Sequence, residues 1–145
     1  MNLKRGNRGF TLIEILIVVA IIGIIVAIAT PLLLEALQRA KQKRTMEDMR
    51  NISVGLECYM VDHTKYPAQY IYIQPYYLGL VPTQDGWGRP WIYDAFDDNN
   101  GYSLSSGGRD GGGHAVSSGF THDFDDSITI VNGQFIAYPE GLQTK

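Results

Sequence analysis

The sequence is poor in cysteine and has no excess of basic residues. Its single cysteine, Cys58, cannot form an internal disulfide, which excludes a small domain stapled by disulfides. Fifteen acidic residues outnumber the 12 lysines and arginines, and the net charge is −3. Because binding to nucleic acid requires clustered Lys and Arg, we expect no nucleic-acid partner. The length of 145 residues corresponds to about one domain.

Motifs that mark common enzymes are also missing. The three histidines, His63, His114 and His122, are not spaced as zinc ligands, and no second cysteine supports a zinc site. The chain contains no Gly-x-Ser-x-Gly motif, and its glycine-rich run lacks the Gly-Lys-Ser/Thr ending of a phosphate-binding loop. We therefore predict that the protein is not an enzyme and has no catalytic residue.

The N-terminal part carries a short basic segment followed by a long apolar run. Residues 1–9 contain Lys4, Arg5 and Arg8, whereas residues 10–34 are mostly apolar. At 1.5 Å per helical residue, this run is long enough to cross a bilayer core of about 30 Å. Since basic residues tend to stay on the cytoplasmic side, we expect a single-pass protein whose C-terminal part lies outside the cytoplasm.

One carboxylate, Glu14, lies near the start of this apolar run. A charged side chain is costly in hydrocarbon, so such residues usually have a partner and a function. No basic residue of the same helix can easily reach Glu14. The sequence therefore predicts a partner for Glu14 on another molecule.

The segment GFTLIE at residues 9–14 resembles the processing site of type IV prepilins and type II secretion pseudopilins. The resemblance implies cleavage after Gly9 by a prepilin peptidase, methylation of the new N-terminal Phe10, and a role for Glu14 in assembly. Cleavage would remove three of the 12 basic residues and none of the 15 acidic ones, which changes the net charge from −3 to about −6.

The same resemblance implies a structural filament subunit. Such a subunit waits in the inner-membrane lipid, meets an assembly platform there, and joins identical subunits in a helical homopolymer in the periplasm or outside the cell. Gly23 and Pro31 match the helix glycine and the helix-bending proline of the family. Since proline removes a backbone donor, we expect a bend or local melting at Pro31, or simply the membrane exit there.

Apolar spacing of three and four residues continues beyond the membrane segment and predicts one helix from Thr11 to Asp62. The chain thus divides into four segments. A leader at 1–9 precedes a membrane-spanning half of the helix at 10–34 and an amphipathic half at 35–62. A β-rich head at 63–145 follows. The fold class is α+β, a long N-terminal helix packed on a small antiparallel sheet, as in pilins. The expected strands are Trp91–Tyr93, Gly101–Ser105, Ser127–Val131 and Gln134–Tyr138, with a short candidate at Tyr70–Ile73.

Two turn signals accompany these strands. Asn132-Gly133 lies between two apolar runs and predicts a two-residue type I′ hairpin turn. Residues 106–119 are rich in Gly and Ser and predict a long loop. Three further runs resemble the major pseudopilins of type II secretion: Lys65-Tyr66-Pro67, DGWGRP at 85–90 and YSLSSGGRDG at 102–111.

The resemblance to major pseudopilins also implies a calcium site in the glycine-rich loop. Its ligands would be Asp110, Asp125 and Asp126, with a carbonyl near Leu104. Calcium takes six to eight oxygen ligands and tolerates irregular loops, and no disulfide is available to hold this one. A second acidic cluster, which turn residues or a cation site explain equally well, contains Asp94, Asp97 and Asp98.

Other functions remain open at this stage. A single-span membrane-anchored binding protein and an envelope enzyme tethered by its N-terminus would share the apolar run. Within the resembled family, a secretion pseudopilus and a surface pilus are both possible.

Overall fold

The computed structural model of the protein describes residues 9–112 and 118–141. The leader residues 1–8, and with them the basic segment, lie outside the described residues, as does His114. The chain forms two compact units, Met1–Glu35 and Ala36–Lys145. We call them the N-terminal unit and the head unit.

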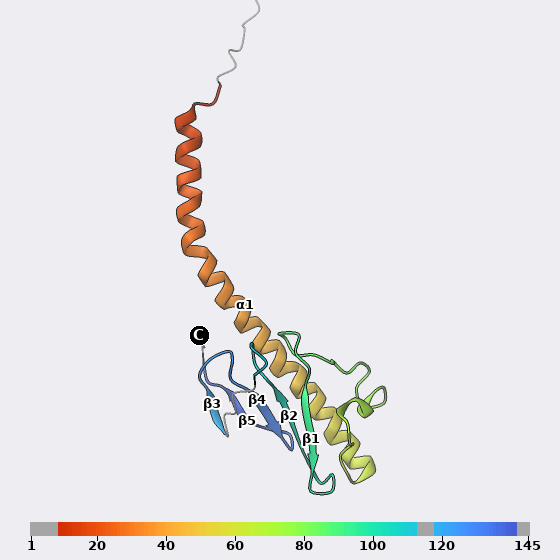
Figure 1. Cartoon of the computed structure of the whole chain (residues 1–145). Coiled ribbons are helices and arrows are strands. Elements are labelled where there is room, and N and C mark those ends of the chain that lie inside the picture. The colour runs from red at the N-terminus through yellow and green to blue at the C-terminus, as the bar shows by residue number, and fades with distance from the viewer. Residues whose placement is uncertain (1–8, 113–117, 142–145) are drawn as a thin grey trace, which may run out of the picture. The chain divides into compact units, whose positions relative to one another are not determined.

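Helix α1 spans Leu12–His63 and belongs to both units (Figure 1). The sequence prediction of one helix over Thr11–Asp62 is therefore confirmed. The helix continues through Pro31 without interruption, so the local melting expected at this position does not occur in the isolated chain. The hydroxyl of Thr30 donates to the carbonyl of Val26 at 2.7 Å, one turn back along the helix.

The second half of α1 provides one wall of the core of the head unit. Met49, Ile52 and Leu56 recur at three- and four-residue steps and are completely buried. They belong to the same apolar cluster as the buried side chains of the sheet. The hydroxyls of Ser53 and Tyr102 lie 2.8 Å apart and form a buried hydrogen bond between helix and sheet. The sheet side of this core consists of Tyr102, Leu104, Ile128 and Ile130, which are also completely buried.

A five-stranded sheet lies along the second half of α1, in the order β1-β2-β4-β5-β3 (Figure 1). The pairs β1–β2, β2–β4 and β4–β5 are antiparallel, which confirms the α+β class. One part of the sheet was not expected: β3 is a short edge strand that pairs parallel to β5. The strands are β1 Ile92–Phe96, β2 Gly101–Ser106, β3 Gly119–Thr121, β4 Ile128–Val131 and β5 Gln134–Pro139.

The turn between β4 and β5 is the two-residue turn that the sequence predicts. Val131 pairs with Gln134, and Asn132 and Gly133 have φ angles of +46° and +80°. Positive φ at both central residues is what a type I′ turn requires. The Asn132 side chain also accepts a hydrogen bond from the backbone N–H of Tyr102 at 2.9 Å, which ties the hairpin to β2.

The short strand considered at Tyr70–Ile73 is wrong, because this segment is a 3₁₀ helix, η1. The backbone N–H of Tyr72 donates to the carbonyl of Gln69, and the N–H of Gln74 donates to that of Ile71, each at 3.1 Å. Ile73 is completely buried, whereas Tyr72 is exposed. The alternation of Tyr and Ile suggested a strand, but burial of Ile73 against α1 decides the conformation.

Candidate functional site

The half of α1 in the N-terminal unit presents a continuous apolar surface. Every large apolar side chain from Leu12 to Leu34 is at least 47% exposed. In the described part of the chain, α1 is the one helix long and apolar enough to cross a membrane. Among the described residues, none buries this half of α1.

Glu14 lies at the N-terminal end of this surface and forms a capping box with Thr11. The Glu14 carboxylate accepts hydrogen bonds from the backbone N–H and the hydroxyl of Thr11, each at 2.9 Å, and the N–H of Glu14 donates to the Thr11 hydroxyl at 3.3 Å. Sequence reasoning expected a partner on another molecule and missed this one, although Thr-x-x-Glu before an apolar run signals a helix N-terminus. Thr11 is neutral, so the negative charge of Glu14 remains uncompensated within these contacts.

Gly9 and Phe10, predicted for processing, and Gly23 and Pro31, predicted for assembly, are likewise exposed. Phe10 precedes the helix and is 79% exposed. Among the described residues, a Cβ added at Gly9 or at Gly23 would meet no atom within 4 Å, so contacts with these residues do not require glycine at either position.

In the structure, the carboxylates predicted to bind calcium accept hydrogen bonds from groups of the protein. Asp125 accepts hydrogen bonds from the guanidinium of Arg109 on both carboxylate oxygens, with Nε to Oδ1 at 2.8 Å. Asp110 accepts from the backbone N–H of Gly112 at 2.7 Å, and Asp126 accepts from that of His122.

The fourth predicted calcium ligand is a carbonyl near Leu104. Leu104 lies within β2, is completely buried, and pairs with Tyr93 on one side and Ile130 on the other. No group of three or more His, Cys, Asp or Glu side chains that could hold a metal forms within residues 9–112 and 118–141. The predicted ligands thus form no such group in the described part of the chain, and calcium binding stays a prediction.

In the second acidic cluster, Asp94 lies within β1 and pairs with Ser103, whereas Asp97 and Asp98 lie in the turn between β1 and β2. Asp97, Asp98 and Asn99 have φ angles of +53°, +54° and +64°, a conformation in which Asp and Asn are enriched. Asp98 forms an ion pair with Lys65, and the carbonyl of Asn99 accepts from the N–H of Tyr66. Turn formation and attachment to the segment after α1 thus account for Asp97 and Asp98.

The Asp-Gly-Trp-Gly run joins α1 to the sheet, a role that sequence reasoning did not assign. The Asp85 carboxylate, 5% exposed, accepts from the N–H groups of Trp87 and Arg89 and, at 2.6 Å, from the hydroxyl of Ser106. The N–H of Gly86 donates to the Thr45 hydroxyl at 2.9 Å. A Cβ at Gly86 would lie 2.2 Å from the carbonyl oxygen of Lys41, so only glycine permits this approach to the helix.

The indole of Trp87 completes this attachment by donating to the side-chain oxygen of Gln38 at 2.8 Å. We call the turn at residues 85–89 the strap. It holds α1 at Gln38 and Thr45, and it holds β2 at Ser106.

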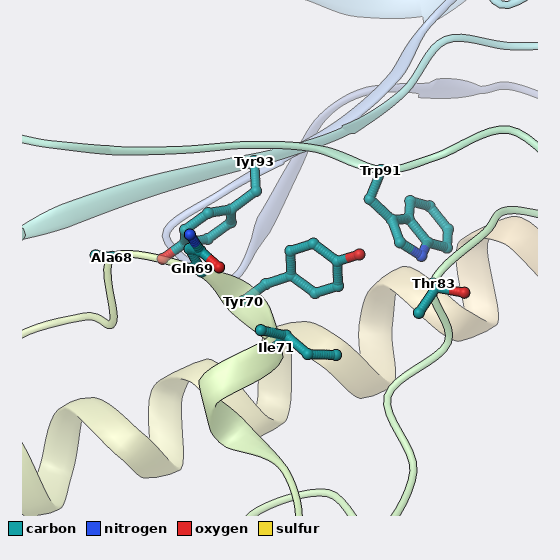
Figure 2. A pocket seen from close by; sticks show the side chains of 7 residues that line it. All are labelled: Ala68, Gln69, Tyr70, Ile71, Thr83, Trp91 and Tyr93. Atoms are coloured by element: carbon teal, nitrogen blue, oxygen red, sulfur yellow. The ribbon is translucent and has the colours of Figure 1, made fainter.

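A pocket of about 340 Å³ opens between η1 and β1. Figure 2 shows the Tyr70 ring between the side chains of Tyr93 and Trp91. The polar ends of two rings are already bound, since the Tyr93 hydroxyl donates to the carbonyl of Pro67 and the Trp91 indole donates to that of Pro82. None of the seven lining residues is charged: Ala68, Gln69, Tyr70, Ile71, Thr83, Trp91 and Tyr93.

A cluster of tyrosines lies where the end of α1 meets the sheet. The Tyr66 hydroxyl donates to both carboxylate oxygens of Glu57, at 3.1 and 3.0 Å, and its ring contacts that of Tyr102. Burial, together with the Glu57 carboxylate, raises the pKa of Tyr66 to about 12. Burial likewise raises the pKa values of Tyr93 and Tyr102.

Comparison with known proteins identifies both parts of the chain. Residues 4–30 match the family model of the prokaryotic N-terminal methylation motif. Type II secretion system core protein G of Pseudomonas aeruginosa is 30% identical over 125 residues, which cover 74% of this chain and 87% of that relative.

Two further relatives carry the same name. The proteins of Klebsiella michiganensis and Escherichia coli are 27% and 26% identical over 126 and 128 residues, and the matches cover 87% and 88% of those relatives. These matches cover 74% and 77% of this chain. No solved structure matches this chain significantly.

Proposed function

The chain belongs to the family of type II secretion system core protein G, and from this premise we propose that it is the major subunit of a secretion pseudopilus rather than of a surface pilus. Its role is that of a structural pseudopilin. The choice of pseudopilus over pilus rests on the relatives named above, whose matches cover about three quarters of this chain.

The observation that carries the filament role is the uncovered half of α1. Its large apolar side chains are at least 47% exposed in the isolated chain, and burying apolar surface is favourable in lipid or in protein. Before assembly, this half of α1 spans the bilayer once, and lipid covers its apolar surface. After assembly, a bundle of α1 helices from many copies covers the same surface. A head-to-tail contact that repeats without closing generates such a helical polymer.

The proposed path begins with a single-pass subunit whose head unit lies outside the cytoplasm. A prepilin peptidase cuts after Gly9, and the amine of Phe10 becomes the methylated N-terminus. An inner-membrane assembly platform then transfers the subunit from lipid to the homopolymer. In the homopolymer, Glu14 pairs with the Phe10 amine of a neighbouring copy. This amine supplies the positive charge that Thr11 lacks.

The mass of the mature N-terminus tests this path. In cells with a type II secretion system, the mature protein should begin at Phe10 and carry one added methyl group. Gly9→Leu should remain at precursor mass and enter no filament, because the bulky side chain blocks the cleavage position.

Gly6→Leu is the matched control, since it changes a glycine in the same leader away from the cut, and it should be processed normally. A Gly9→Leu protein that still begins at Phe10 would contradict the proposal. So would an unmodified protein that keeps its first nine residues in assembled filaments.

A further inference from the structure

The glycine-rich loop after β2 is closed by contacts between its two sides. The Arg109 guanidinium donates through Nε and Nη2 to the two carboxylate oxygens of Asp125, which is 16 residues further along the chain. The backbone N–H of Arg109 also donates to the carbonyl of Phe124 at 2.8 Å. One residue thus binds its neighbours across the loop with its side chain and with its backbone.

The far side of the loop contains Phe124, which is buried in the core. The near side, which contains Gly108, passes close to it. Phe124 is 2% exposed. Gly108 has a φ of +77°, and a Cβ at this position would lie 2.5 Å from the carbonyl oxygen of Asp125. Glycine is therefore required where the two sides pass, and the position of Arg109 opposite Asp125 follows from this close approach.

The remaining carboxylates of the far side organise their own turn. Oδ1 of Asp123 accepts from the backbone N–H groups of Asp125 and Asp126, at 2.8 and 3.1 Å. Oδ2 of Asp126 accepts from the N–H groups of His122 and Asp123. These bonds hold residues 122–126 in a compact turn without recourse to a cation.

We propose that the Arg109 guanidinium is the resident cation of this loop, and that the loop stays closed without a divalent metal ion. A guanidinium fork matches a carboxylate bidentately, which gives this contact both strength and direction. A divalent ion at Asp125 would lie beside the guanidinium and be repelled by it. The Arg109 and Asp125 side chains are 44% and 25% exposed, so the pair is partly screened by salt.

Thermal unfolding of the full-length protein in detergent micelles, with calcium, magnesium or a chelator, tests the proposal. Both tryptophans, Trp87 and Trp91, lie in the head unit, so their fluorescence reports this unit. The unmodified protein should have the same Tm in all three conditions. Arg109→Gln and Asp125→Asn should each lower Tm by about 1–5 °C, and the double variant should lose no more than either single variant.

Two further variants separate this pair from general effects of charge. Lys65→Gln removes the more exposed Lys65–Asp98 ion pair, whose side chains are 49% and 86% exposed, and should change Tm less than Arg109→Gln does. Arg109→Lys keeps the charge but loses the fork, so its Tm should lie between those of the unmodified protein and Arg109→Gln. A gain of calcium response in Arg109→Gln would support the proposal, because the displaced guanidinium would then expose a cation site.

A calcium response of the unmodified protein would overturn the proposal. The decisive result would be a higher Tm in calcium than in magnesium, lost in Asp110→Asn, because this outcome would assign the loop to a metal ion. Additive losses of Tm in the Arg109→Gln/Asp125→Asn double variant would also contradict the proposal, because they would show that the two side chains stabilise the fold independently.

Discussion

In the N-terminal unit, the large apolar side chains of α1 from Leu12 to Leu34 are all exposed, whereas in the head unit Met49, Ile52 and Leu56 are completely buried. The two halves of one helix thus differ in whether their own chain buries their apolar side chains. The second half finds its apolar partners in β2 and β4 of its own chain. The first half has no such partners among the described residues, and on the proposed path lipid or further copies supply them.

This difference shows why one helix can serve two states of the protein. Substitutions in the second half should change the folding of each subunit, and substitutions in the first half should change its environment and assembly. The three predictions below test this separation.

The largest effect is expected at Glu14. Glu14→Gln should abolish assembly while leaving membrane insertion intact, because the charge that pairs with the Phe10 amine is lost. Glutamine still suits a capping box with Thr11, so this variant separates the ionic role from the start of the helix. Filament yield against membrane-bound subunit is the measurement.

Glu14→Ala is the companion variant, since it removes the charge and the capping contact together. Equal failure of Gln and Ala is expected. Wild-type filament yield from Glu14→Gln would show that the carboxylate acts only as a helix cap.

An intermediate effect is expected in the core of the head unit. Leu56→Ala should lower the free energy of unfolding by about 2–5 kcal/mol, because it leaves a cavity in a completely buried position. Ile17→Ala, an apolar truncation in the exposed half of the same helix, should change it by less than about 0.5 kcal/mol. Denaturant unfolding in micelles, followed by tryptophan fluorescence, compares the two. Comparable losses would show that the halves do not act separately.

The smallest effect is expected from Tyr66. Tyr66→Phe should cost about 1 kcal/mol at pH 8, through loss of the hydrogen bond to Glu57. The folded-state pKa, about 12, is above the ordinary value of 10, so Tyr66 stabilises the fold fully below pH 10 and loses this contribution as pH rises towards 12.

The Tyr66→Phe variant should therefore show a shallower loss of stability between pH 10 and 12 than the unmodified protein. Tyr76→Phe is the control, because Tyr76 is 89% exposed. All nine tyrosines lie beyond Cys58, so the alkaline transition reports the head unit and not the N-terminal half of α1. An unchanged slope in Tyr66→Phe would contradict the assignment.

The features that the sequence predicted well depend on local chemistry. The period of apolar residues placed α1 within one residue at each end, and Asn132-Gly133 placed the β4–β5 hairpin. In these cases the residues that carry the signal also form the structure. The GFTLIE segment likewise identified the family, which the relatives then showed.

The features that sequence reasoning missed depend on contacts between distant residues. The 3₁₀ helix η1 follows from the burial of Ile73, and β3 becomes a strand only because β5 lies beside it. Arg109 binds Asp125, which lies 16 residues further along the chain, and no local sequence pattern predicts this pairing. The Thr11–Glu14 capping box was visible as a motif, but its place inside an apolar run directed attention to charge alone.

The strap gives the molecule a defined route for mechanical load. When a subunit is drawn out of a bilayer or pulled along a growing fibre, tension enters the head through α1. The strap contacts α1 at Gln38 and Thr45, close to where the helix enters the head unit, and continues through Asp85 to Ser106 on β2. Several hydrogen bonds near the start of the head unit therefore transfer part of a force along α1 to the sheet. This transfer occurs before the force reaches the buried core at Leu56.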